Sequence, residues 1–106
     1  MPCSLQRDPS FACDFIGTAG NAVNILVRGT APATIFRAEL NGAALTLSPD
    51  NTRTSFNITA GGCALLIQVT AAPGDTVDIL EDCGGSEHVL RSASAVDPIK
   101  RITICA

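Results

Sequence analysis

Five cysteines are the residues of this sequence with the widest choice of chemistry, because thiols can form disulfides, bind metal ions or act as nucleophiles. They stand at positions 3, 13, 63, 83 and 105. None forms a Cys-x-x-Cys pair, the arrangement whose tight turn makes a tetrahedral zinc site easy to close. The spacing therefore does not predict structural zinc. Because the number of cysteines is odd, at least one thiol must stay free or pair with another chain.

The segment from Cys63 to Cys83 consists of two apolar runs around an Ala-Pro-Gly-Asp turn. A β-hairpin that places Val77 and Ile79 opposite Val69 and Ile67 on the core face also sets Cys63 opposite Cys83. This register requires a bulge beside the glycine that adds one residue. We therefore expect a Cys63–Cys83 disulfide, which would close a loop of about 20 residues and contribute roughly 3 kcal/mol to stability. Two pairings of Cys13 stay open, one with Cys3 and one with Cys105.

Carboxylates gather between residues 75 and 87, where a calcium site is one interpretation. Calcium takes carboxylate and carbonyl oxygens as ligands, and Glu81, Asp82 and Glu87 flank two glycines that let carbonyls turn inward. These three residues are the candidate calcium ligands. The segment lacks the spaced Asp-x-Asp-x-Asp-Gly pattern of a dedicated calcium loop, so the alternative is a solvated acidic rim. Glu81 shares the alternation of the core-facing residues and is expected to point inward.

The single histidine, His88, is the side chain best suited to act as a base, a metal ligand or a pH sensor near neutral pH. No nucleophile elbow, zinc-protease helix or phosphate-binding loop accompanies it. The sequence therefore predicts no enzyme, no catalytic residue and no cofactor other than the calcium considered above. We place His88 on a strand or just before one. Together with Gly84, Gly85 and Ser86 of the preceding loop, it is a candidate residue for contact with a partner.

Short segments rich in β-branched and apolar residues recur about every 8 to 12 residues between turn residues. They cover residues 22–29, 33–40, 43–48, 52–59, 63–71, 75–83, 87–93 and 100–106. None keeps a helical period over about ten residues. We therefore predict an all-β fold, an antiparallel β-sandwich of about seven or eight strands. It forms one domain over residues 1–106, with residues 1–10 as an N-terminal tail.

Asn41-Gly42 is the strongest hairpin signal in the sequence, because both central residues of a type I′ turn need a positive φ. A two-residue turn at this point sets Leu40 opposite Ala43. The same register assigns Phe36 to the core face.

A second turn, Gly61-Gly62, predicts another hairpin of this kind. It sets Ile58 opposite Leu65, and it assigns the alternate residues of both strands to the core. These core residues are Phe56, Ile58, Cys63, Leu65, Ile67 and Val69.

Composition excludes several classes of function. The chain has 106 residues, a formal net charge of −3 and scattered basic residues, so it lacks the basic footprint of a nucleic-acid-binding protein. It has neither Trp nor Tyr, the rings on which sugar recognition relies. No apolar run reaches the roughly 18 residues of a membrane helix, and the first residues lack a signal-peptide core. Because cysteine-rich small domains are typical of oxidising compartments, we expect an extracellular or periplasmic protein in its mature form, without its signal peptide.

The predicted hairpin registers, alternating faces and disulfide all stabilise the fold, so we expect function on loops or on a sheet edge. We expect a non-enzymatic extracytoplasmic interaction or structural module that binds another protein. The alternatives are a small secreted inhibitor or effector that acts on a partner protein, and a calcium-dependent binding module that uses residues 75–87. The terminal strand at 100–106 could also exchange between subunits or complement a partner's sheet edge. The pattern is similar in general architecture to immunoglobulin-like and fibronectin type III sandwiches, although it lacks the buried Trp and tyrosine corner of immunoglobulin domains.

Overall fold

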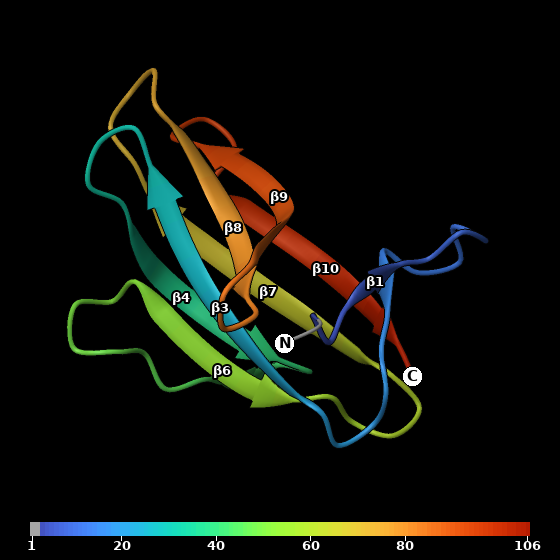
Figure 1. The fold of residues 1–106 in the computed structure, drawn as a ribbon. Helices are drawn as coiled ribbons and strands as arrows, with labels where there is room; N and C mark the ends of the chain where they lie inside the picture. The colour runs from blue at the N-terminus through green and yellow to red at the C-terminus, as the bar shows by residue number, and fades with distance from the viewer. Residues whose placement is uncertain (1–2) are drawn as a thin grey trace.

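The computed structural model describes residues 3–106, which form ten β-strands in two sheets (Figure 1). The strands are β1 (Gln6–Arg7), β2 (Phe15–Ile16), β3 (Ala22–Gly29), β4 (Thr34–Leu40), β5 (Ala43–Ala44), β6 (Arg53–Asn57), β7 (Cys63–Thr70), β8 (Thr76–Asp82), β9 (Glu87–Ser94) and β10 (Ile99–Cys105). The six-stranded sheet has the order β1-β2-β10-β7-β4-β5, and the four-stranded sheet has the order β6-β3-β8-β9. The described residues contain no helix, so the all-β prediction is confirmed.

Each of the eight segments predicted from the sequence overlaps one strand from β3 to β10. The two strands that sequence patterns missed, β1 and β2, have two residues each and show no alternation. All neighbouring strands are antiparallel except β2 and β10, which run parallel and make the six-stranded sheet mixed. Within residues 3–106, no helix is long and apolar enough to cross a membrane.

Alternate side chains of both sheets meet in one hydrophobic core. Ile25 and Ile79 of the four-stranded sheet are fully buried, as are Ile67 and Ile102 of the six-stranded sheet. Every second residue of β7 is buried, because successive side chains of a strand point to opposite faces of the sheet. The predicted inward positions of β6, β7 and β8 are therefore confirmed.

The hairpin at Asn41-Gly42 is confirmed in turn and register. Asn41 and Gly42 have φ values of 52° and 84°, and Leu40 lies opposite Ala43. The assignment of Phe36 to the core is wrong, because the pairing of β4 with β7 shifts by one residue between Ile35 and Arg37. This bulge turns Ile35 inward and leaves the Phe36 side chain 67% exposed.

The hairpin predicted at Gly61-Gly62 is wrong. β6 pairs with β3 in the four-stranded sheet, whereas β7 lies between β4 and β10 in the other sheet. The chain crosses from one sheet to the other at this turn. Alternation is a property of each strand alone, so it assigned the buried faces correctly without revealing which strand was the partner.

The hairpin predicted from Cys63 to Cys83 is wrong for the same reason. β7 belongs to the six-stranded sheet, and β8 pairs with β3 and β9 in the four-stranded sheet. Cys63 is a buried free thiol, and Cys83 forms a disulfide with Cys3. The predicted Cys63–Cys83 disulfide is therefore wrong.

The C-terminal strand β10 is held on both of its edges. β7 pairs with one edge over six residue pairs. On the other edge, Asp14 N–H donates to the Thr103 carbonyl, the Asp14 carboxylate accepts Thr103 N–H at 2.9 Å, and the Arg91 guanidinium donates to the Arg101 carbonyl at 3.2 Å. Exchange of this strand between subunits would have to break these contacts.

Candidate functional site: an N-terminal hook and its projecting loop

Residues 3–16, which we call the N-terminal hook, are packed into the fold, although residues 1–10 were predicted to form a tail. The structure describes this segment from Cys3 onward. Leu5 is 0% exposed and Phe15 is 1% exposed, and both belong to the hydrophobic core. The hook lies beside β10 (Figure 1), with β2 paired to the end of that strand. Its buried apolar side chains and its pairing with β10 both attach it to the body.

Two disulfides tie the hook to distant parts of the chain. Cys3 joins Cys83 at the end of β8, and Cys13 joins Cys105 at the end of β10, with Cα–Cα distances of 5.0 and 6.0 Å. Of the two partners left open for Cys13, the structure therefore selects Cys105. Each bond spans 80 residues or more of sequence. Spacing along the chain could not reveal such pairs.

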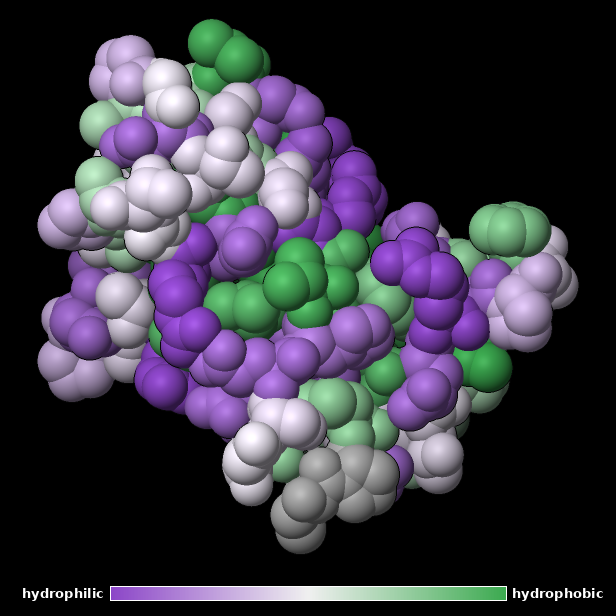
Figure 2. Space-filling view, turned by 45° about the horizontal axis from the view of Figure 1, so that its top comes forward, coloured by the Kyte–Doolittle hydropathy of each residue, from purple (hydrophilic) through white to green (hydrophobic). Residues whose placement is uncertain are grey.

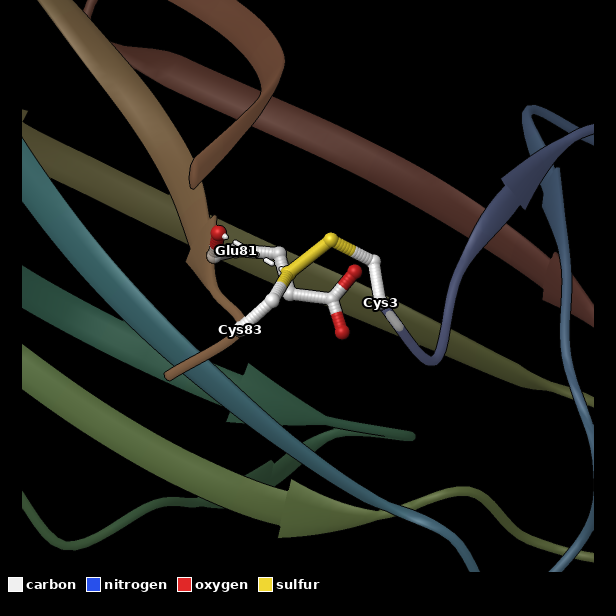
Figure 3. A group of neighbouring side chains, drawn as sticks. All are labelled: Cys3, Glu81 and Cys83. Atoms are coloured by element: carbon white, nitrogen blue, oxygen red, sulfur yellow. Dashed lines mark hydrogen bonds between the residues drawn. A yellow bond between two sulfur atoms is a disulfide. The ribbon is translucent and has the colours of Figure 1, made fainter. Parts of the chain in front are cut away.

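Glu81 is the inward carboxylate that conflicted with an apolar core, and the hook resolves this conflict. The residue is 2% exposed. Its Oε2 accepts Ser4 N–H at 2.8 Å, and its Oε1 accepts Leu5 N–H at 3.2 Å. A buried carboxylate is tolerated when it accepts hydrogen bonds. The Ser4 and Leu5 N–H groups, which lie outside the strands, donate these bonds to Glu81. Figure 3 shows the Glu81 carboxylate next to the Cys3–Cys83 disulfide.

His88 lies in β9, and its side chain faces the hook. It lies directly opposite Glu81 in the β8–β9 ladder, and its Nδ1 is 3.9 Å from Glu81 Oε1. Its ring meets the ring of Phe15 edge to face, with the centroids 5.6 Å apart. The Arg7 guanidinium lies 5.5 Å from the Phe15 ring centroid, at a distance typical of cation–π contact. His88 is therefore placed to contact the hook and the Glu81 carboxylate together.

The loop between β1 and β2, residues 8–13, is held in one shape by Asp8. This side chain is buried, and its Oδ1 accepts the backbone N–H of Ser10 at 2.9 Å and the Ser10 hydroxyl at 2.7 Å. Its Oδ2 accepts Cys13 N–H at 2.9 Å. The hydrogen bonds from the Ser10 hydroxyl and from the Cys13 and Ser10 amides lower the pKa of Asp8 below its ordinary value. The Cys13–Cys105 disulfide closes the far end of the same loop.

Phe11 stands at the tip of this loop. Its side chain is 85% exposed, and its φ of 61° is a left-handed conformation that bulky residues rarely adopt. Phe11 N–H donates to the Asp8 carbonyl at 3.2 Å, which tightens the turn. Figure 2 shows the loop standing away from the rest of the molecule, with apolar surface at its end. Such an outlier is a reason to look for function at the position.

The three candidate calcium ligands do not converge. Glu81 faces the interior, whereas Asp82 and Glu87 follow the opposite alternation and face outward. Both oxygens of Glu87 accept hydrogen bonds from the Arg28 guanidinium at 2.6 Å, and Asp82 accepts one from Arg53 at 2.8 Å. These arginine hydrogen bonds hold the pKa of Glu87 and of Asp82 below the ordinary carboxyl values. The expected calcium set is thus divided between two faces of the sheet, and its outward members are already paired with arginines.

The loop from Cys83 to Glu87 is a closed turn. Gly84 and Gly85 have φ values of 71° and 133°, which only glycine adopts easily. Cys83 N–H donates to the Ser86 carbonyl at 2.9 Å. Gly84, Gly85 and Ser86 are exposed, as expected, and their role as interaction residues stays a prediction.

Sequence reasoning missed Asp8, Ser10 and Phe11. The Asp-Pro-Ser run at 8–10 carried a usable signal, because an aspartate side chain readily accepts the backbone amide two residues later. Comparisons with protein-family models, with curated proteins and with solved structures find no match to this chain.

Proposed function

We propose that this protein is a non-enzymatic module that binds another protein through the loop at residues 8–13, with Phe11 as the central contact. The observation that carries the proposal is the 85% exposure of Phe11 on a loop tied by Asp8 and by a disulfide. Exposed single hydrophobic residues are common and by themselves indicate nothing. An aromatic residue held outward in a strained conformation is different, because the fold maintains it against a cost in free energy.

The rigidity of the loop favours tight binding. Ordering a flexible loop on binding costs free energy, and a loop that is already fixed avoids most of that cost. Aromatic side chains also dominate interface hot spots, since one ring buries a large apolar area with few rotatable bonds. Burial of the Phe11 side chain in a partner would contribute about 1.5 to 3 kcal/mol.

The proposed location is outside the cytoplasm. Two disulfides support it, because such bonds persist in oxidising compartments. For the two sheets we propose a sandwich related in general architecture to immunoglobulin-like or fibronectin type III domains. The neighbours β4, β7 and β10 suit this type, whereas the β8–β9 hairpin, which joins the other sheet, is an addition to the usual order.

Photo-cross-linking at the loop tip would test the proposal. A photoreactive phenylalanine derivative is placed at Phe11, or at Phe36 as a matched control that is also exposed but lies on the six-stranded sheet. Both proteins are exposed to the extracellular or periplasmic fluid of the native source. We expect one protein to be captured from position 11 and not from position 36.

The affinity of the captured protein for single variants then measures the contribution of the ring. We expect Phe11→Ala to weaken binding by about 10- to 100-fold and Phe36→Ala to leave it unchanged. Equal affinity for both variants would contradict the proposal. Unchanged melting temperatures of both variants would show that the loss does not come from unfolding.

An inhibitor or effector role is the second candidate, and the disulfide-anchored loop favours it, because a rigid projection can fill a partner's cleft. In that case the captured partner is an enzyme or receptor whose activity falls on titration with this protein. Phe11→Ala would then shift the inhibition curve by the same factor as the affinity. Undiminished partner activity at saturation would leave only the binding role.

A further inference from the structure

The turn from β8 to β9 and the start of the hook bring together four side chains that bind transition metals. The sulfur atoms of Cys3 and Cys83 and a carboxylate oxygen of Glu81 all lie within 4.8 Å of one another. His88 adjoins this group through Glu81, with 3.9 Å between Nδ1 and Oε1. We propose that, when the Cys3–Cys83 disulfide is reduced, these four residues bind one zinc ion.

The register of two strands aims these side chains at one point. Glu81 and Cys83 are two residues apart at the end of β8, so they share the inner side of the sheet. His88 is the cross-strand partner of Glu81 in β9, and it shares that side. Cys3 arrives from the hook, and the disulfide itself shows that its sulfur reaches Cys83.

The distances suit a tetrahedral ion. Zinc binds sulfur at about 2.3 Å and nitrogen or oxygen at about 2.0 to 2.2 Å, so neighbouring donor atoms lie roughly 3.3 to 3.8 Å apart. The Glu81 Oε1 and His88 Nδ1 atoms are 3.9 Å apart, just above this range, so a small movement of the ring would bring them to it. The His88 side chain is 31% exposed, and to bind the same ion its ring must turn from its contact with Phe15 toward the sulfurs.

The donor set and its surroundings are those of a zinc site. Two thiolates, an imidazole and a carboxylate are all common zinc ligands. Ser4 and Leu5 N–H groups hold the Glu81 carboxylate in place, which is the role that outer hydrogen bonds play around bound metals. Glu81 is 2% exposed and Cys83 is 8% exposed, so the ion would be shielded from water on the inner side.

The chemistry requires a reductant, which can be a dithiol or a phosphine. A phosphine takes the oxygen of one water molecule, becomes a phosphine oxide and leaves two thiols on the protein. Zinc then binds both sulfurs as thiolates, and their two protons pass to solvent. The covalent tie between hook and β8 is replaced by a metal tie, so the hook stays attached in either redox state.

The other disulfide provides a matched control inside the same molecule. Asp8, Cys13 and Cys105 also have donor atoms within 4.8 Å of one another. This group has no fourth donor from histidine, because His88 is the only one in the chain. We therefore expect this second group not to form a tetrahedral site.

Cobalt(II) binding to the reduced full-length chain tests the proposal. The background variant is Cys63→Ala, which removes the buried free thiol. After reduction with a phosphine under nitrogen, cobalt is added and then displaced by zinc. We expect one equivalent to give the intense visible bands of tetrahedral cobalt and a thiolate-to-cobalt band in the near ultraviolet. We expect no such bands from the oxidised protein.

Variants decide which residues bind. Replacing Cys3 and Cys83 by serine should abolish the spectrum, whereas replacing Cys13 and Cys105 by serine should preserve it. Glu81→Gln and His88→Asn should each weaken cobalt affinity at least about tenfold, the usual scale for losing one ligand or its support. Far-ultraviolet circular dichroism follows folding at every step. If the reduced metal-free chain unfolds, zinc should refold it, and the same substitutions that weaken cobalt binding should weaken this refolding.

Three results would overturn the zinc site. They are the absence of tetrahedral cobalt in the reduced chain, retention of the spectrum without Cys3 and Cys83, and unchanged affinity in Glu81→Gln and His88→Asn. The test is independent of the proposed protein binding, because Phe11 takes no part in the metal site. Phe11→Ala should therefore leave cobalt binding intact.

Discussion

Replacing Leu5 by alanine would measure how far the N-terminal hook belongs to the core. The Leu5 side chain is 0% exposed and is part of the core cluster. It packs against Gly17 so closely that a Cβ atom on Gly17 would lie 3.4 Å from one of its methyl carbons. Leu→Ala at fully buried sites costs about 2 to 5 kcal/mol, because the lost transfer free energy adds to the cost of a cavity. We expect about 3 kcal/mol, since disulfides at both ends of the hook limit its collapse into the cavity.

Thermal unfolding of the oxidised protein, followed by calorimetry or circular dichroism, provides the assay. A loss of about 3 kcal/mol corresponds to a fall in melting temperature of roughly 10 to 20 °C for a domain of this size. Gln6→Ala is the matched control, because Gln6 is the next residue and is exposed. It should change stability by no more than about 0.5 kcal/mol. A loss below about 1 kcal/mol for Leu5→Ala would falsify the view that the hook is part of the core.

Two further predictions concern Cys63 and Asp8. Alkylation of the unfolded, unreduced protein followed by peptide mapping should label Cys63 alone, and label on Cys3, Cys13, Cys83 or Cys105 would refute the disulfide assignment. The pKa of Asp8 is lowered in the fold, so its hydrogen bonds stabilise the loop fully above the ordinary aspartate value of 3.8, and the effect is lost as the pH falls through the lower folded value. A carboxyl-detected NMR titration that places the Asp8 midpoint at or above 3.8 would contradict this prediction, whereas the expected midpoint lies below it.

The strands from β3 to β10 were predictable because the pattern that defines a strand lies within its own residues. β-branched and apolar residues at alternate positions define a strand and its buried face without any knowledge of its neighbours. Ile67, Val69, Val77 and Ile79 were assigned inward on this basis, and all four are buried. The turn at Asn41-Gly42 was predictable too, since both of its residues adopt the positive φ that their types allow.

Two of the three predicted strand pairings were wrong, because a tight turn does not guarantee a hairpin. Residues 58–62 and 71–75 carry the chain from one sheet to the other, and nothing in their types distinguishes a crossing from a return. The bulge beside Phe36 similarly depends on how β4 fits against β7. A wrong strand partner leaves the predicted face of a strand intact, whereas the bulge in β4 changed the face of Phe36.

The sequence by itself determined the fold class, the positions of eight strands and the inward face of each strand from β6 to β8. It also determined that one of its five cysteines could not pair within the chain. Only the tertiary structure decided which cysteines meet, that Glu81 holds the hook, and that Phe11 stands outside. The physical reason is the sequence separation of the interacting residues. Side-chain alternation and turn residues act over a few positions. The hook contacts residues about 80 positions away, and only the packing of the folded chain brings these groups together.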